Sequence, residues 1–308
     1  MTGTNVIERN LYADAIVGRT GLGNMLFPWA RAEIFCRDHG ARMLAVRWTN
    51  VLRVGPWLRR ERDKRYYFRH FTNRPYICGP RRMFVCMLAR RVSEQDALQG
   101  GLDRQAGPLI VEFRGMEGLF KPLAGSREFI SRRLHEIVHP RLREKLRFHD
   151  GEPYIAVHVR RGDFRSVTNP VAQSGGMWNY QISDEWYASC VAQCRRALGT
   201  DFPVVAFSDA KPAELDGLRV RIRGLQVAPP AEAIVDILRL SGAEVLVCSN
   251  SSFSLWAQFL GGMPSIWHPG PVRQRLSELE VEASVNGELP DEFLSRIAKR
   301  DANEQSST

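Results

Sequence analysis

The sequence contains no hydrophobic run as long as the ~18 residues that a membrane-spanning helix needs,. Its first ten residues also lack the basic-then-apolar order of a secretory signal peptide. Both absences favour a protein that stays in the cytoplasm. The chain has 308 residues with a composition of 44% hydrophobic and 25% charged residues, typical of a folded protein. We therefore expect two domains of about 150 residues each.

Cysteine is sparse, and its spacing argues against a disulfide framework and against a metal site built from cysteines. The six cysteines are scattered over a long chain, which favours reduced thiols over a disulfide framework. Cys190 and Cys194 stand four residues apart in a helical pattern, as a metal-binding pair could. No second Cys or His pair accompanies them, so we interpret them as buried core thiols.

Acidic residues are nearly absent from the segment Arg42–Arg91. It holds fourteen arginines and lysines against Glu61 and Asp63, a net charge of +12, whereas the whole chain carries +9. Aromatic residues are interleaved there: Trp48, Trp57, Tyr66, Tyr67, Phe68 and Phe71. This pattern is compatible with a nucleic-acid surface, with peripheral contact to an anionic membrane, and with a merely solvated basic face.

The first half begins with the order of elements of a Rossmann-like unit. An apolar stretch at 13–17 leads into the loop Gly18–Asn24, a helical period at 25–39 and a second apolar stretch at 43–46. Strand, glycine loop, helix and strand in this order are typical of a parallel α/β domain.

The glycine loop indicates an anion site but not a nicotinamide site. Gly21 and Gly23 leave room for a ligand at the start of the helix, where free amides and the helix dipole favour negative charge. The loop does not complete a GxGxxG motif, because Pro28 and Trp29 occupy the later positions. A nicotinamide cofactor is therefore disfavoured.

The middle of the chain sets the expected domain boundary. Residues 47–91 show no clean period and are expected to be an irregular, arginine-rich excursion of the first domain. Residues 126–147 have a helical period interrupted by Pro140, and turn residues follow at 150–153. We predict a first domain over 1–150, a second over 151–300, and a disordered tail over 301–308.

The second half alternates short strands and helices, which predicts a parallel α/β domain. The expected strands are at 154–159, 203–207, 220–222 and 245–248, and the expected helices at 184–198, 231–240 and 254–260, the first of them capped by Ser183. Ligands bind beyond the carboxyl ends of the strands in such a sheet.

Three polar clusters follow expected strands. Arg160 and Arg161 offer two guanidinium forks that can each hold a phosphate, although a solvated charged turn would look the same. Ser208 and Asp209 follow the next strand. The cluster Ser249–Ser252 precedes a helix and could bind a diphosphate or simply cap that helix.

Three motifs carry a resemblance to a known family: Gly21–Asn24 (GLGN), His158–Asp163 (HVRRGD) and Ser249–Trp256 (SNSSFSLW). Phe207–Asp209 and Ile182–Tyr187 match shorter landmarks between them. The chain resembles the α-1,2-fucosyltransferases of glycosyltransferase family 11, within the inverting fucosyltransferases that share an HxRRxD motif. The resemblance covers roughly residues 15 to 45 and 152 to 268.

The resemblance implies a GT-B fold, an α/β architecture of two Rossmann-like domains facing each other across a cleft. The second domain would hold GDP-fucose and the first would serve the acceptor side, with no cofactor or metal. Arg160 and Arg161 would neutralise the departing GDP, since negative charge builds on the leaving phosphate. Motifs and strand ends together predict these donor-binding residues: His158, Gly21, Gly23, Asn24, Ser208, Asp209, Asn250, Ser251, Ser252 and Phe253. Asp236, on the helix expected at 231–240, is a further donor-binding candidate, directed toward the ribose or base, although a solvated helix charge would look the same.

An inverting displacement also needs a base for the acceptor hydroxyl. Asp163 is the carboxylate nearest the arginine pair and could act as this base or as an ion-pair brace; Asp184 and Glu185 are weaker alternatives. The implied activity is α-1,2-fucosyl transfer to a free or lipid-linked glycan, in surface-polysaccharide or oligosaccharide assembly. The alternative is a non-catalytic protein that binds polyanions or nucleic acid through its arginine-rich segment.

Overall fold

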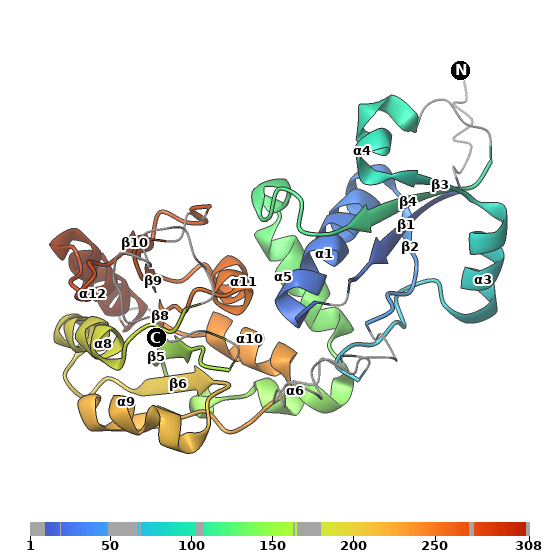
Figure 1. Ribbon diagram of the computed structural model, residues 1–308. Coiled ribbons are helices and arrows are strands. Elements are labelled where there is room, and N and C mark those ends of the chain that lie inside the picture. Colours follow the sequence, from blue (N-terminus) through green and yellow to red (C-terminus); the bar gives the residue numbers. More distant parts are fainter. Residues whose placement is uncertain are drawn as a thin grey trace. The chain divides into compact units, whose positions relative to one another are not determined.

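The computed structural model describes residues 10–18, 20–48, 67, 69–102, 107–162, 164, 180–270 and 274–305 (Figure 1). These residues form two compact α/β units, and the chain passes from the first to the second between His139 and Pro140. The division therefore comes earlier than the boundary expected after residue 150. Pro140 begins a helix of the second unit, so the proline that interrupts the helical period also marks the change of unit.

The first unit is built on a parallel four-stranded sheet of order β2-β1-β4-β3. Its strands are β1 (Leu11–Ile16), β2 (Arg42–Met43), β3 (Arg90–Ser93) and β4 (Leu109–Arg114). Its longer helices are α1 (Leu22–His39), α3 (Gly79–Leu88) and α5 (Arg127–Ile137). Shorter helical segments are α4 (Glu94–Asp96), η1 (Ala97–Gly101) and η2 (Lys121–Leu123).

Part of the segment expected to be irregular is in fact regular. Residues 79–93 form α3 and β3, and β3 completes the edge of the sheet beside β4. Pro80 stands in the first turn of α3, where its missing N–H costs nothing. The expectation of an irregular excursion over 47–91 was therefore wrong for these residues, because α3 has one buried position and too weak an inward pattern to read from sequence.

The second unit is built on a parallel six-stranded sheet of order β10-β9-β8-β5-β6-β7. Its strands are β5 (Ile155–Val159), β6 (Val204–Ser208), β7 (Leu225–Val227), β8 (Val245–Val247), β9 (Ser265–Trp267) and β10 (Glu280–Glu282). Its helices are α6 (Pro140–Leu146), η3 (His149–Gly151), α8 (Asp184–Leu198), η4 (Pro212–Leu215), α9 (Asp216–Arg221), α10 (Ala233–Ser241), α11 (Ser252–Gly261) and α12 (Asp291–Gln305).

Helix α8 follows its sequence pattern closely. Ser183 caps it as predicted, since its side chain accepts a hydrogen bond from the amide of Trp186 at 3.2 Å. Cys190 and Cys194 face the core and are fully buried, as expected of structural thiols. Burial raises the pKa of Cys194 to about 12, so this thiol stays protonated.

The strand expected at 220–222 is a helix. Residues Asp216–Arg221 form α9, and the strand β7 follows at Leu225–Val227. A short run of β-branched residues cannot be distinguished from a helical turn by periodicity alone. Here Asp216 pairs with Arg219 one turn later at 3.0 Å, which supports the helix.

The second unit depends on a close approach between α10 and α11. A Cβ atom added to Gly261, at the end of α11, would lie 2.1 Å from the backbone carbonyl oxygen of Ser241, at the end of α10. It would also lie 2.9 Å from the sulfur of Met263. Because the first obstacle is backbone, one of the two helices would have to move.

We therefore expect Gly261→Ala to lower the free energy of unfolding by about 1–3 kcal/mol, the usual cost of overpacking. Urea unfolding followed by tryptophan fluorescence measures the change. Gly18→Ala is the matched control, because nothing lies within 4 Å of a Cβ at that position. Equal stability of the two variants would show that α10 and α11 are not in close contact there.

Candidate functional site

The strand order of the second unit has one topological switch point. From β5 the chain proceeds outward through β6 and β7, then returns to the other side of β5 for β8, β9 and β10. Neighbouring strands whose connections leave in opposite directions form the topological switch point where α/β sheets bind ligands. The residues after β5 and after β8 both come from the predicted motifs, so this switch point is the candidate site.

Asp209 holds the turn that follows β5. One of its carboxylate oxygens accepts the backbone amide of Arg161 at 2.9 Å, and the other pairs with the guanidinium of Arg160 at 3.0 Å. A Cβ atom on Gly162 would lie 2.2 Å from this carboxylate, so a larger residue there would displace it. The Arg160–Gly162 turn is therefore fixed by a carboxylate from the end of β6.

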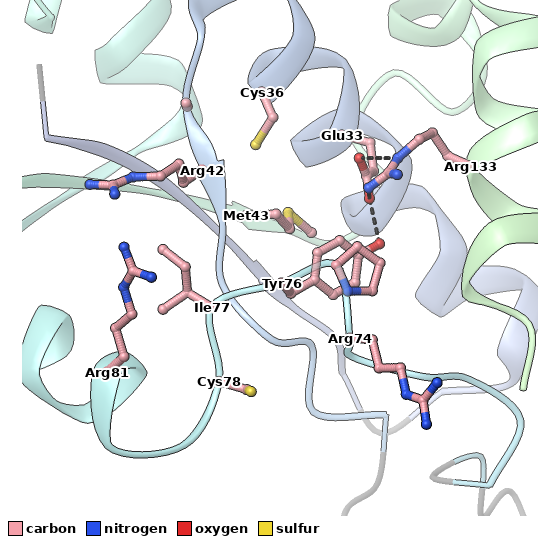
Figure 2. A pocket seen from close by; sticks show the side chains of 12 residues that line it. Glu33, Cys36, Arg42, Met43, Arg74, Tyr76, Ile77, Cys78, Arg81 and Arg133 are labelled. Carbon is pink, nitrogen blue, oxygen red and sulfur yellow. Dashed lines mark hydrogen bonds and ion pairs between the residues drawn. The ribbon is translucent and has the colours of Figure 1, made fainter. Parts of the chain in front are cut away.

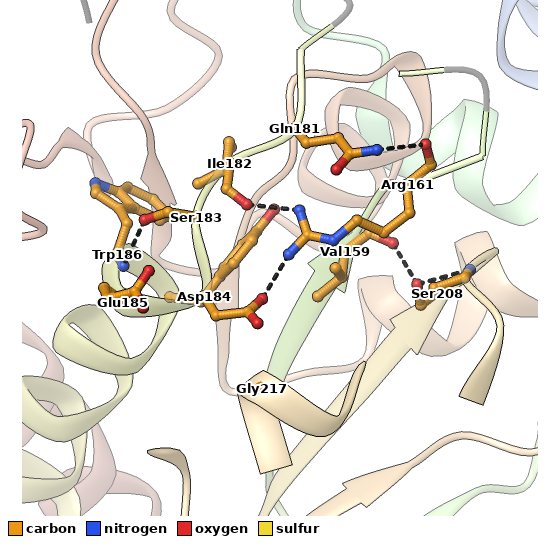
Figure 3. Close-up of polar contacts among 12 residues, drawn as sticks. Val159, Arg161, Gln181, Ile182, Ser183, Asp184, Glu185, Trp186, Ser208 and Gly217 are labelled. Carbon is orange, nitrogen blue, oxygen red and sulfur yellow. Dashed lines mark hydrogen bonds and ion pairs between the residues drawn. The ribbon is translucent and has the colours of Figure 1, made fainter. Parts of the chain in front are cut away.

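Arg161 is turned inward and bound by protein groups (Figure 3). Its guanidinium donates to the carbonyl oxygen of Ile182 at 2.6 Å and pairs with Asp184 at 2.5 Å. Its side chain is only 9% exposed. In this arrangement Arg161 braces the loop against the start of α8.

Arg160 is the more accessible of the two arginines. Its side chain is 26% exposed, against 9% for Arg161. Its guanidinium lies 5.7 Å from the ring centroid of Phe164, within the range of a cation–π contact. Asp209 and Phe164 thus orient a guanidinium that still reaches the solvent at the switch point.

His158, on β5, connects the two halves of the site. Its Nδ1 lies 2.7 Å from the hydroxyl of Ser254, 3.0 Å from that of Ser249 and 3.5 Å from that of Ser251. Burial, reinforced by the nearby charge of Arg160, lowers the pKa of His158 to about 3. The imidazole is therefore neutral at physiological pH and organises the serine cluster rather than carrying charge.

The cluster after β8 forms the beginning of α11. Ser251 caps this helix by accepting the amide of Ser254, and the ring of Phe253 stacks on His158 with centroids 6.1 Å apart. Ser252 and Phe253 are half-buried, so the first turn of the helix remains partly accessible. A helix start with this exposure attracts an anion through its amides and its dipole.

Asn250 is buried at the same place with an incomplete set of contacts. It is 2% exposed, and its amide lies near the hydroxyl of Tyr180, where it opposes the rise that burial causes in the pKa of that phenol. Neither polar atom of the amide completes a hydrogen bond of normal geometry with a described residue. A buried amide in this state is a group that a ligand can satisfy. Its position between β8 and α11 places it in the candidate site.

Other predicted site residues have different environments. Ser208 is used within the β6 turn, since its hydroxyl donates to the carbonyl of Val159 at 2.6 Å and accepts the amide of Ala210 at 3.0 Å. Asp236 is half-buried in the first turn of α10. Glu185 is exposed and paired with Arg221, and Asp163 lies outside the described residues.

The glycine loop lies in the first unit, after β1. Gly21 is the N-cap residue of α1, Gly23 is buried within its first turn and Asn24 is half-buried. The amide of Leu22 donates to the hydroxyl of the buried Tyr67 at 3.2 Å. The structure therefore places this motif at a helix start, as its sequence predicts.

Several residues of the site are not evident from the sequence. Ser254 is the nearest partner of His158, and its only signal is membership of the same serine-rich motif. Gln181 donates to the carbonyl oxygens of Arg161 at 3.2 Å and Phe164 at 3.0 Å. Tyr187 donates to the carbonyl of His158 at 3.1 Å, and its only signal in the sequence is its place in the landmark Ile182–Tyr187.

A separate cavity of about 570 Å³ lies in the first unit (Figure 2). None of the predicted site residues lines it. Four arginines do: Arg42, Arg74, Arg81 and Arg133. Glu33 neutralises one of them, since it pairs with Arg133 at 3.0 Å and also accepts the hydroxyl of Tyr76. In Figure 2, Arg81 extends from α3 toward Arg42.

Two further features bear on ligands and membranes. Among the described residues, no three His, Cys, Asp or Glu side chains come together as a metal-binding group. No helix in the described part of the chain is long and apolar enough to span a bilayer.

The model of glycosyl transferase family 11 matches residues 126–268. This stretch contains the HVRRGD motif, all of β5 to β9 and the start of α11. The match confirms, over this part of the chain, the family resemblance that the motifs predict. No curated protein sequence matches the chain.

Several solved structures to which the chain is similar are described as fucosyltransferases. NodZ α-1,6-fucosyltransferase co-crystallised with GDP is 15% identical, with a TM-score of 0.52 over 85% of this chain and 96% of that one. A fucosyltransferase NodZ structure from Bradyrhizobium is 15% identical, with a TM-score of 0.49 over 83% and 94%. POFUT1 in complex with GDP is 11% identical, with a TM-score of 0.47 over 89% and 98%. The first of these, together with the two parallel sheets, confirms the predicted GT-B fold.

The pKa of His158 makes a testable difference to stability. Between about pH 6 and 4 the unfolded chain protonates this imidazole, whose ordinary pKa is 6.5, while the folded protein keeps it neutral. The unfolded state then binds more protons, so the free energy of unfolding falls as pH falls, by about 1 kcal/mol per pH unit from this group. We expect His158→Gln to remove that part of the slope in urea unfolding measured across this range.

The control for this measurement is His135→Gln, which changes an exposed histidine on α5 of the first unit. This variant leaves the carboxylates and the serine cluster unchanged. Its free energy of unfolding should therefore change with pH by the same slope as that of the unmodified chain. Identical slopes for all three proteins would show that His158 titrates normally in the folded state.

Proposed function

Since the chain carries the glycosyl transferase family 11 region over residues 126–268, we propose that it is an inverting fucosyltransferase. It transfers L-fucose from GDP-fucose to a hydroxyl group of a glycan, by direct displacement and without a metal ion. One observation carries the proposal: the accessible guanidinium of Arg160 and the start of α11 flank the switch point between β5 and β8.

This pair of positive groups suits the chemistry of the leaving group. Breaking the bond between the sugar and the diphosphate builds negative charge on the departing GDP. A guanidinium and helix-start amides that are already oriented stabilise that charge without reorganisation in the transition state. A NodZ structure of similar fold was co-crystallised with GDP, which supports a guanine nucleotide as the donor's carrier.

The neighbouring residues have distinct proposed roles. The neutral His158 positions the hydroxyls of Ser249, Ser251 and Ser254 and therefore the start of α11. Asn250 offers both a donor and an acceptor to the ribose or base of the nucleotide. Ser252 and Phe253, on the first turn of α11, contact the phosphates.

Three more of the expected donor contacts belong to other elements. Asp236, in the first turn of α10, is proposed to bind the ribose. Gly23 and Asn24 are proposed to offer an anion the backbone amides at the start of α1. Asp209 acts indirectly, because its carboxylate is engaged by the Arg160–Gly162 turn.

The catalytic base is proposed to be Asp163. Asp184 is engaged by Arg161, and Glu185 by Arg221, so neither carboxylate is as available for proton abstraction. Asp163 follows the fixed Arg160–Gly162 turn directly in the sequence. A base there would accept the acceptor's proton as its oxygen attacks the fucose carbon opposite the departing phosphate.

The acceptor is proposed to be a free or lipid-linked glycan bound by the first unit, with an α-1,2 linkage formed in polysaccharide or oligosaccharide assembly. The alternative of a nucleic-acid surface is less well supported. Three of its aromatic residues, Trp48, Tyr67 and Phe71, are buried and cannot stack on bases.

We expect Arg160→Gln to weaken GDP binding by about 10- to 100-fold, the range for loss of a charge-assisted contact. The effect on kcat/KM should be larger than on binding, because the charge of the leaving group grows in the transition state. Isothermal titration with GDP and steady-state transfer assays measure both. Arg221→Gln is the matched control, since Arg221 is exposed and paired with Glu185. GDP affinity that survives in the Arg160 variant would remove the basis of the proposed site.

We also expect Asp163→Asn to lower kcat by about 10²- to 10⁴-fold while leaving the KM for GDP-fucose within a few-fold, as for a lost general base. The assay is run in EDTA, and the unmodified enzyme should keep its rate there. GDP-mannose and UDP-sugars are assayed alongside GDP-fucose. Turnover confined to UDP-sugars, or abolished by EDTA, would contradict the proposed donor or the metal-free mechanism.

A further inference from the structure

Helix α3 of the first unit exposes an unusually apolar face. Four large hydrophobic side chains on it are exposed: Met83 (64%), Phe84 (63%), Met87 (75%) and Leu88 (59%). At 100° per residue they fall within about 140° of the helix circumference. A helix of a water-soluble protein ordinarily turns such a stripe toward its core.

The opposite side of α3 is fixed to the sheet, so the apolar face cannot turn inward. Val85 packs on Tyr12, Leu44 and Ile110. Arg82 pairs with the buried carboxylate of Asp14 on β1 at 3.1 Å. This anchoring leaves the apolar face directed away from the sheet.

The chain in and around α3 is strongly basic. The described residues 69–93 contain six arginines and no acidic residue. Arg82 and Arg91 are bound to Asp14 and Glu112 of the sheet. Three exposed arginines, Arg74, Arg81 and Arg90, make no ion pair with any described residue.

We propose that α3 docks the protein on an anionic phospholipid bilayer. The helix would lie in the plane of the interface, with Met83, Phe84, Met87 and Leu88 among the acyl chains. Arg74, Arg81 and Arg90 would contact lipid phosphates, to which basic side chains are attracted. Arg81 and Arg74 also line the cavity of the first unit, which gives a phosphate headgroup a recess beside the helix.

The positive charge around the apolar face of α3 favours an anionic bilayer over other binding partners. A second copy of the chain would bring two basic faces together, and like charges oppose that contact. A nucleic acid would match the charge but would leave the Met, Phe and Leu side chains without partners. An anionic lipid surface satisfies the apolar and the basic parts together.

The test is co-sedimentation of the full chain with vesicles. We expect binding to vesicles of phosphatidylcholine and phosphatidylglycerol in equal parts. Binding to vesicles of pure phosphatidylcholine should be weaker by about tenfold or more. Phe84→Gln combined with Met87→Gln should reduce binding to the anionic vesicles about tenfold or more. Glutamine is chosen because it keeps helix propensity. Arg81→Gln with Arg90→Gln should weaken binding and flatten its dependence on salt.

Val220→Gln is the matched control, because Val220 is an 85% exposed apolar residue on a helix of the second unit. It should bind vesicles like the unmodified chain. GDP affinity should be unchanged in all of these variants, so the result stands apart from the proposed transfer. Failure of the unmodified chain to bind anionic vesicles, or binding that survives in the Phe84/Met87 variant, would overturn the proposal. A concentration-dependent dimer that this variant abolishes would assign the face to a second copy instead.

Discussion

The candidate site depends on one carboxylate, that of Asp209 at the end of β6. It binds the backbone of Arg161 and the guanidinium of Arg160, so it sets both the path of the turn and the direction of the accessible arginine. Gly162 is required because any side chain would displace this carboxylate. Asp209 therefore fixes the turn that contains both arginines and orients the accessible guanidinium of Arg160.

The second arginine gives this turn its rigidity. Arg161 is almost fully buried, and its partners Ile182 and Asp184 come from the approach to α8. Removing one partner from a buried pair typically costs about 3–5 kcal/mol, because the other charge is left without compensation. The same α8 start is close to Gly217 of α9, whose Cβ would meet Asp184 at 2.4 Å. The arginine motif is thus held by the end of β6 and the start of α8.

The electrostatics of the site follow from the neutrality of His158. A protonated imidazole there would bring a second positive charge close to Arg160, and burial would make it costly. The Nδ1 atom of the neutral ring instead lies within hydrogen-bond distance of three serine hydroxyls, the nearest being that of Ser254. The positive potential at the switch point therefore comes from Arg160 and the α11 dipole, and it does not vary with pH in the physiological range.

The sequence predicts the parts of this arrangement that are local. Alternating strands and helices, the Ser183 cap and the positions of the motifs at strand ends all follow from patterns within a few residues. It does not reveal which of two adjacent arginines is buried, because that depends on Asp184 and Ile182, more than twenty residues later. It also does not separate the helix α9 from a strand, because the run around Val220 is too short to show a period.

The composition of the arginine-rich segment does not predict which of its residues are buried. Its net charge is visible in the sequence, but the sheet neutralises part of it through Asp14 and Glu112. Its aromatic residues at 48, 67 and 71 enter the core, whereas the apolar residues of α3 stay outside. Composition alone would predict the reverse. Large aromatic residues between arginines suggest an exposed surface, whereas the apolar run Met-Phe-Val-Cys-Met-Leu of α3 suggests a buried helix. What decides is the buried Asp14, because its pairing with Arg82 fixes which side of α3 faces the sheet.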